Sequence, residues 1–206
     1  MQGELLARKQ LEEDPYAFRG MREYRPTDSM RRINWKSTAK AGKLLVNMYE
    51  SSFSQEIQIL LNGDCRDERH KRELQEMAIS LASSIAAELL QKGVPVSLSG
   101  NLTDILSKEP VCCEAGVHKS HLEKMDRRLA LADTEQLSGS FAELIKKSGK
   151  DGAADKCYLV ITAEDTEDIR AAVEAKRTDG EAVYGIIICR EGESGPAREG
   201  FLWWEV

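Results

Sequence analysis

The chain lacks the hydrophobic segments that mark membrane-spanning and secreted proteins. None of its apolar runs approaches the roughly 18 residues that cross a bilayer. Its start, Met1-Gln2-Gly3, has neither the charged region nor the apolar region of a secretory signal. We expect these residues to form a soluble cytoplasmic domain, and a membrane segment is expected only in parts of a longer parent protein outside this chain.

Cysteines are few and do not have the paired spacing of a zinc site. An odd number without a secretory signal is typical of reduced thiols in the cytosol. Apolar neighbours surround them, so we expect small buried hydrophobic residues. The five are Cys65, Cys112, Cys113, Cys157 and Cys189, and the adjacent pair Cys112 and Cys113 should point to opposite faces of a strand.

Motifs of nucleotide binding and of covalent catalysis are missing. The sequence contains no G-x-S-x-G, Walker or G-x-G-x-x-G pattern. His118 and His121 are three residues apart on an expected helix, but zinc needs further ligands, so a solvated pair is favoured. His70 should lie at the surface. These observations predict a protein without enzymatic activity, and an enzyme with an unrecognised site is the remaining alternative.

The chain has the composition of a globular protein. Its 206 residues are 41% hydrophobic and 31% charged. This length fits one α/β domain with an appendage, or at most two small domains.

Charge is distributed unevenly along the sequence. Residues 19–43 carry eight basic and two acidic side chains, a local charge of +6. The chain as a whole carries −6, which leaves −12 on the remainder. An acidic body would repel phosphates that the basic segment attracts, which argues against general nucleic-acid binding.

Strands and helices are predicted to alternate through most of the chain. Residues 1–17 show no sustained period and are expected to form a short helix or a frayed arm, followed by a helical turn within 29–40. Strands are expected over 44–49, 56–61, 94–98, 111–113, 157–162, 183–189 and 201–206. Helices are expected over 68–91, 118–131, 140–147 and 165–176.

This alternation predicts an α/β, Rossmann-like fold with a mostly parallel central sheet and helices on both faces. Such sheets bind ligands beyond the carboxyl ends of their strands, where the strand order reverses. We expect that rim to contain residues 62–66, the loop near Gly116, and residues 162–165.

One long segment resembles the signature of the bacterial domain of unknown function 58 family, R-E-Y-x-P-G-D-x-x-R-x-I-x-W-K-x-S-A-R. The matching residues are Arg22-Glu23-Tyr24-Arg25-Pro26-Thr27-Asp28, Arg31, Ile33-Asn34-Trp35-Lys36 and Ala39-Lys40. The stretches "AGVHKSHLEKMDRRLALAD" and "CYLVITAE" lie where that family has its middle helix and central strand. The resemblance implies an N-terminal arm and basic Arg/Trp segment over 1–43 and a von Willebrand factor A-like domain over 44–206.

The same resemblance implies a setting more than an activity. The family has no established biochemical activity, and its members carry transmembrane helices before this region. Their genes often lie beside a MoxR-type AAA+ ATPase. We therefore expect a non-enzymatic interaction module on the cytosolic face of a membrane-anchored parent, with such an ATPase as partner.

Von Willebrand A domains often hold a divalent cation through a D-x-S-x-S motif, a Thr and an Asp, and Mg²⁺ prefers such oxygen ligands. The corresponding stretch here is Asn62-Gly63-Asp64-Cys65-Arg66, which has lost the first carboxylate and both hydroxyls. Reading from Asp64 restores carboxylates but no hydroxyl pair. The expectation is a degenerate metal site, for which Asp64, Thr162 and Asp165 are the only candidate ligands. The alternative function is a cation-dependent binding domain that uses Asp64 and Asp165.

The basic segment is the strongest candidate for a partner-binding surface, because Arg and Trp dominate interface hot spots. Its residues are Arg22, Tyr24, Arg25, Asp28, Arg31, Arg32, Trp35 and Lys36. We expect Tyr24, Ile33 and Trp35 to face inward and some arginines to face an acidic partner. Two alternatives remain open: internal pairing with Glu23 and Asp28 as a folding scaffold only, or binding to anionic lipid headgroups.

A second aromatic feature lies near the end of the sequence. If residues 201–206 form a strand, Trp203 and Trp204 must point in opposite directions. One indole should then pack against the sheet while the other is exposed at a contact surface or under a covering loop.

Overall fold

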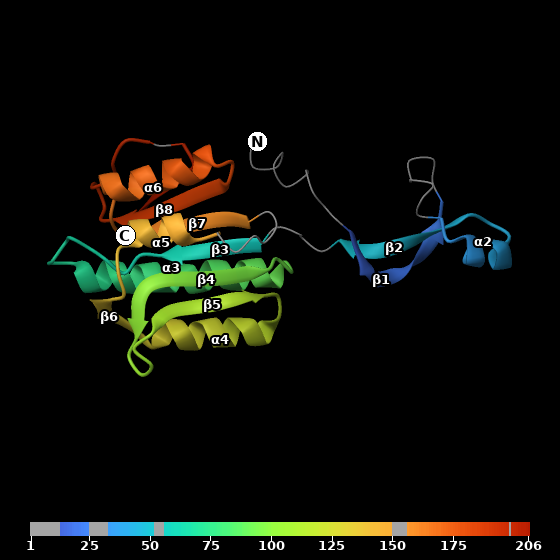
Figure 1. Cartoon of the computed structure of the whole chain (residues 1–206), viewed down its shortest axis with the longest axis horizontal. Helices are drawn as coiled ribbons and strands as arrows, with labels where there is room; N and C mark the ends of the chain where they lie inside the picture. The colour runs from blue at the N-terminus through green and yellow to red at the C-terminus, as the bar shows by residue number, and fades with distance from the viewer. Residues whose placement is uncertain (1–12, 25–32, 52–55, 150–155, 198) are drawn as a thin grey trace. The chain divides into compact units, whose positions relative to one another are not determined.

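The computed structural model describes residues 13–24, 33–51, 56–149, 156–197 and 199–206. The chain divides into two compact units, Met1–Ser54 and Gln55–Val206, which are described separately (Figure 1).

The first unit is a two-stranded antiparallel sheet with a short helix in its connection. Strand β1 (Glu13–Glu23) pairs with β2 (Leu45–Ser51), and helix α2 (Trp35–Ala41) lies between them in sequence (Figure 1). Ile33 forms an isolated bridge to Val46, and these two side chains are buried. Burial of this β-branched pair helps to fix the connection against the hairpin.

Helix α2 is held by its ends. The side chain of Asn34 caps its start by accepting a hydrogen bond from the backbone N–H of Ser37 at 3.0 Å. Gly42, in the left-handed region at φ 67°, ends it. Thr38 Oγ1 accepts a hydrogen bond from the backbone N–H of Leu45 at 3.0 Å and so joins the helix to β2.

The position of the strand over 45–51 corrects the expected architecture. A strand over 44–49 is the expectation, and β2 lies there, but it pairs with β1 instead of joining the central sheet. The first compact unit therefore extends to Ser54 and does not end at residue 43. Residues 13–17, expected as helix or arm, are part of β1, and residues 1–12 lie outside the described part. The pairing joins segments more than 20 residues apart, and a local sequence pattern does not contain that information.

The second unit is built on a seven-stranded, mostly parallel sheet, which confirms the predicted fold class. The strand order is β5-β4-β3-β7-β8-β9, and β6 also pairs with β4. Pairs β3–β4, β3–β7, β7–β8 and β8–β9 are parallel, whereas β5 and β6 run antiparallel to β4. The strands are β3 (Glu56–Leu61), β4 (Val96–Asp104), β5 (Pro110–Gly116), β6 (Ala132–Leu137), β7 (Lys156–Thr162), β8 (Ala182–Cys189) and β9 (Phe201–Glu205).

Helices cover both faces of this sheet, as expected (Figure 1). On one face α3 (Lys71–Gln91) and α4 (Lys119–Ala130) pack on a core that includes Ile59, Leu98 and Ile161. On the other, α5 (Phe141–Lys147) and α6 (Glu167–Thr178) pack on Leu60 and Val160. Alternate residues of β3 and β7 enter different cores, which explains why both strands read as continuous apolar runs.

Strand β6 is a feature that the sequence did not indicate. Its sequence, ADTEQL, is polar, and its side chains are half-buried or exposed. It pairs with the last residues of β4, which therefore extends to Asp104 and not only to residue 98. Backbone pairing in this strand is not accompanied by an alternating apolar pattern, so periodicity could not reveal it.

The direction of β5 corrects the expected rim. Gly116 lies opposite Val96, the first residue of β4, because β5 is antiparallel to β4. The loop near Gly116 is therefore at the amino edge of the parallel strands. The carboxyl edge is formed by the residues after Leu61 and Thr162, where β4 and β7 flank β3 on opposite sides.

The burial of the cysteine and C-terminal tryptophan side chains shows which way each one faces. Cys65, Cys113 and Cys189 are buried, Cys157 is half-buried and Cys112 is exposed, so the adjacent pair faces opposite ways as predicted. Trp203 packs near Gly195, and its Nε1 donates to Pro196 O at 3.3 Å, whereas Trp204 is 43% exposed. The opposed indoles are thus confirmed.

Candidate functional site

A buried network of amide side chains joins the strands at the carboxyl edge of the sheet. Asn62, directly after β3, donates from Nδ2 to Thr162 Oγ1 at 3.0 Å. Asn101 in β4 donates from Nδ2 to Asn62 Oδ1 at 3.1 Å and accepts from the Gly63 N–H at 2.7 Å. Gln75 of α3 donates from Nε2 to Gly63 O at 2.6 Å. The loop after β3 is therefore held from three neighbouring elements.

This network uses the groups that a metal site would need. Asn62 stands at the first position of the D-x-S-x-S pattern, and its Oδ1 already accepts from Asn101 and from the Asp64 N–H at 3.0 Å. Thr162 Oγ1 accepts from Asn62 and from the Glu164 N–H, and donates to Glu164 O. Both side chains are buried and bonded within the protein, so they act as structural bridges between strands.

Two of the three candidate metal ligands, Thr162 and Asp165, have partners within the protein. Asp165 forms a bidentate pair with Arg170, at 2.8 Å to Nε and 2.9 Å to Nη2. Asp64 is exposed and Thr162 is buried in the amide network. Within the described ranges, no group of three or more His, Cys, Asp or Glu residues could hold a metal ion. Of the three candidate ligands, Asp165 is thus engaged by Arg170 and Thr162 by the amide network.

A polar pocket of about 190 Å³, which we call the rim pocket, opens at this edge. It is lined by side chains from the loops after β3 and β7, from β4, and from the starts of α5 and α6. These residues are Asn62, Asp64, Arg66, Asn101, Gly139, Ser140, Phe141, Ala142, Glu164, Thr166, Asp168 and Ile169.

Glu164 places a buried carboxylate in the rim pocket. It is 8% exposed, and none of the described residues donates a hydrogen bond to its Oε1. Arg66 Nε lies 3.6 Å from that oxygen, but the Arg66 side chain is 80% exposed. Burial, together with the negative charge of Asp64, raises the pKa of Glu164, and Arg66 opposes this rise. The rim pocket thus holds a carboxylate whose charge is only partly compensated.

Sequence reasoning missed the residues that organise this edge. Gln75 did carry a signal, since it is a polar residue on the buried side of the long helix α3. Asn101 and Glu164 carried none, because an amide within a strand and a carboxylate after one are both ordinary at exposed positions.

The histidines have structural roles at two other places. His121 Nε2 lies 2.9 Å from Val96 O, and its ring packs on Gly116, so the expected solvated pair with the exposed His118 is wrong for one member. His70 precedes α3 and lies 2.9 Å from Asp67 Oδ2 through Nδ1.

In the first unit, helix α2 exposes an aromatic and basic face, the α2 surface, formed by Trp35, Lys36 and Lys40. Trp35 is 62% exposed, and α2 has no buried residue. The expectation that Trp35 faces inward is therefore wrong, whereas Ile33 is buried as predicted and Tyr24 is half-buried. Ile33 occupies the inner position because it precedes the helix and bridges to β2.

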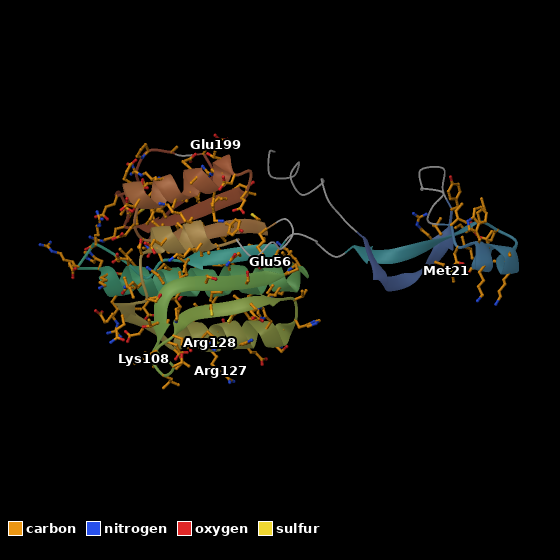
Figure 2. All side chains as sticks on the ribbon, in the orientation of Figure 1. Met21, Glu56, Lys108, Arg127, Arg128 and Glu199 are labelled. Carbon is orange, nitrogen blue, oxygen red and sulfur yellow. The ribbon has the colours of Figure 1, made fainter. Side chains whose placement is uncertain are left out.

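Exposed apolar side chains border this helix. Met21 of β1, labelled in Figure 2, is 47% exposed, and Asn34 Nδ2 lies 3.8 Å from its sulfur. Leu44, just before β2, is 43% exposed. The first unit therefore combines cationic and apolar groups on and beside one short helix.

Only part of the predicted partner-binding set can be located. Arg22 is half-buried and donates from Nη1 to Glu23 O at 3.1 Å. Glu23 pairs with Lys43, so one acidic residue of the segment is neutralised internally. Arg25, Asp28, Arg31 and Arg32 lie outside the described residues.

Among the helices in the described parts of the chain, none combines the length and apolar character of a membrane span.

Comparison with known proteins yields one curated relative and several structural likenesses. The chain is 24% identical over 149 residues to the uncharacterised protein YeaD of Bacillus subtilis (strain 168), and the match covers 72% of this chain and 35% of that protein. The chain thus spans about a third of the length of this relative.

Solved structures resemble it at lower identity. Proximal thread matrix protein 1 of the mussel byssus has 10% identity and a TM-score of 0.43, covering 72% of this chain and 39% of that chain. An aerotolerance-related membrane protein from Bacteroides fragilis NCTC 9343 has 12% identity and a TM-score of 0.38, with coverages of 70% and 78%. The conserved hypothetical protein BatB from Bacteroides thetaiotaomicron has 15% identity and a TM-score of 0.38, with coverages of 71% and 77%.

The family match is more extensive than any of these likenesses. The profile of the protein family of unknown function DUF58 matches residues 20–183, which include the end of β1, all of α2 and β2, and the second unit as far as the start of β8. The chain therefore belongs to the DUF58 family.

Proposed function

We propose that this chain is a non-enzymatic protein-interaction module that binds an acidic surface of a partner through the α2 surface. The observation that carries the proposal is Trp35, a large aromatic side chain that is 62% exposed on a helix without a buried residue. An indole that leaves water on binding contributes a large apolar area, which is why Trp is enriched in interface hot spots.

The charges around Trp35 support an acidic partner. Lys36 and Lys40 are exposed and four residues apart, so they lie on the same side of α2 and repel each other. Carboxylates of a partner would relieve this repulsion and speed encounter through electrostatic attraction. The exposed Met21 and Leu44 add apolar area beside the helix.

The proposal also names a partner and a cellular location. We infer a MoxR-type AAA+ ATPase as partner and a place on the cytosolic face of a membrane-anchored parent, as the family resemblance implies. The length of the curated relative supports a longer parent, since this chain covers 35% of it. Nucleic acid is a poor candidate because the chain outside residues 19–43 carries a charge of −12.

Calorimetric titration of a purified MoxR-type ATPase into the full chain tests the proposal. Trp35→Ala should weaken binding by about 30-fold, which corresponds to the roughly 2 kcal/mol of a hot-spot residue. Trp204→Ala is the matched control, because Trp204 is also exposed but lies on β9 of the second unit. Equal affinity of the Trp35→Ala variant and the unaltered chain would contradict the proposal.

Anionic lipid is the competing target of the α2 surface. Sedimentation with phosphatidylserine vesicles at two salt concentrations distinguishes the two, because salt screens attraction to headgroups. Salt-sensitive vesicle binding that Lys36→Glu/Lys40→Glu abolishes, without binding to the ATPase, would replace the protein partner with a membrane surface.

A further inference from the structure

We propose that the rim pocket binds a cationic side chain of a partner protein, an arginine in the first instance, between Glu164 and Asp64. This site belongs to the second unit and does not depend on the α2 surface.

Glu164 is incompletely paired in the rim pocket. Its side chain is more than nine-tenths buried, it lines the rim pocket, and no described residue donates a hydrogen bond to Oε1. A buried carboxylate oxygen without a donor is costly, and proteins retain such groups where a ligand completes them. The raised pKa of Glu164 has the same origin, namely burial beside Asp64.

The lining of the rim pocket is predominantly acidic among its charged residues. Asp64 and Asp168 are exposed carboxylates at its mouth, and Arg66 is its only basic lining residue among those described. Asp64 uses Oδ1 to accept from the Cys65 N–H at 3.0 Å. The starts of α5 and α6 contribute partial positive charge, but α6 carries Glu167 and Asp168 in its first turn, which compensate it. Apart from Asp168, two lining carboxylates, Glu164 and Asp64, therefore face the single basic side chain described there, that of Arg66.

The position of Arg66 indicates what the ligand would do. Arg66 Nε is 3.6 Å from Glu164 Oε1, beyond hydrogen-bond distance, and its side chain is 80% exposed. The Arg66 side chain lowers the cost of the buried charge without bonding to Oε1, and the Arg66 backbone N–H adds a hydrogen bond to the same carboxylate. A guanidinium entering from a partner could approach Oε1 closely and displace Arg66 toward solvent.

The size and spread of the lining favour an organic cation over a metal ion. About 190 Å³ would hold roughly six water molecules, enough for a guanidinium and part of its stem. The carboxylates are too dispersed to form a metal cluster among the described residues. A planar guanidinium has five donors and can span separate acceptors.

Nuclear magnetic resonance of the full chain tests this site with N-acetyl-arginine methylamide, whose only charge is the guanidinium. The probe should shift the backbone amide signals of residues 64–66 and 164 in a saturable way. The citrulline analogue, of the same shape but neutral, should not. The corresponding lysine compound distinguishes ammonium from guanidinium: weaker binding of lysine supports the arginine assignment, and tighter binding makes lysine the ligand of the same site.

Two variants and a matched control locate the interaction. Glu164→Gln should weaken probe binding at least tenfold, whereas Glu123→Gln, an equal charge change on the exposed side of α4, should leave it unchanged. Arg66→Ala should bind the probe at least as tightly as the unaltered chain. Thermal unfolding of each variant checks that the fold is retained.

Three results would overturn the proposal. The first is probe binding that Glu164→Gln does not weaken. The second is saturable binding of inorganic phosphate with the same signals shifted, which would make this an anion site of Arg66 and the helix starts. The third is saturable binding of Mg²⁺ there, which would favour the alternative of a cation-dependent binding domain.

Discussion

The rim pocket of the second unit and the α2 surface of the first unit both concentrate polar groups, but the two regions treat them differently. At the rim, Asn62, Asn101 and Thr162 are buried and bonded to one another, so that polarity holds neighbouring strands together. On α2, Trp35, Lys36 and Lys40 are exposed and contribute little to the unit that carries them. The polar side chains at the rim therefore stabilise the fold, whereas the apolar indole of Trp35 on α2 is exposed and available for binding.

Stability measurements test this difference between the two regions directly. The largest loss of stability is expected at Lys176, a buried cation of the second unit. Lys176 is 5% exposed, donates to Ser148 O at 2.6 Å and to Glu181 Oε2 at 2.5 Å, and lies 3.8 Å from the centre of the Tyr158 ring. Lys176→Ala should reduce the free energy of unfolding by about 3 kcal/mol, because it removes a buried side chain and leaves two partly buried acceptors without their donor. Urea denaturation measures the change. Lys146→Ala, an exposed lysine of α5, is the control and should change it by less than about 0.5 kcal/mol.

The next effect should come from the amide network. Asn101→Ala removes the acceptor of the Gly63 N–H and a donor to Asn62, and should cost about 2 kcal/mol in urea denaturation. A change below about 0.5 kcal/mol would mean that the network is not structural, and the contrast with α2 would disappear.

A smaller effect of opposite sign is expected at Glu164. Its pKa is raised in the folded protein, so the folded state binds more protons than the unfolded state, and stability falls as pH rises from the ordinary pKa through the raised one. Glu164→Gln should therefore raise the free energy of unfolding at pH 7 by about 1 kcal/mol. The gain should vanish below pH 4, where both states are protonated. A loss of stability of Glu164→Gln at pH 7 would contradict the inference that the ionised Glu164 carboxylate destabilises the folded state.

Asp104 provides the matched comparison, with the reverse pH dependence. The N–H groups of Ser107 and Leu106, with Arg128 (labelled in Figure 2) at 3.2 Å, lower the pKa of this carboxyl at the end of β4. Its contribution is present above the ordinary pKa and is lost as pH falls through the lowered one. Asp104→Asn should destabilise the chain at pH 7, and the difference should shrink in acid, as thermal unfolding across pH would show.

The smallest change is expected on α2. Trp35→Ala should alter the free energy of unfolding by less than about 0.5 kcal/mol, because the side chain is mostly exposed. The same variant is expected to bind the partner about 30-fold more weakly. A loss of more than about 1.5 kcal/mol would show that Trp35 is part of the core of the first unit, and the two regions would no longer differ.

Local pattern predicted most elements of the second unit because each strand or helix buries an apolar face. The run Cys157–Thr162 lies in β7, and the periodic apolar residues of 68–91 became α3, which starts at Lys71 after its N-cap residue His70. The same method missed β6, whose pairing with β4 has no apolar pattern, and it assigned residues 13–17 to a helix or arm. The position of the rim was predictable from the fold class. The loop near Gly116 was assigned to the wrong edge because the direction of β5, which is antiparallel to β4, is not visible in the sequence.

The sequence by itself determined the fold class, the family and the uneven distribution of charge, since periodicity, an extended motif and composition are local properties. Only the tertiary structure decided that Ile33 is buried while Trp35 is exposed, that Asn62 and Thr162 bond to each other, and that Glu164 is buried with an oxygen lacking a donor. The physical reason is that burial and hydrogen bonding depend on partners distant in the chain, such as the 100 residues between Asn62 and Thr162.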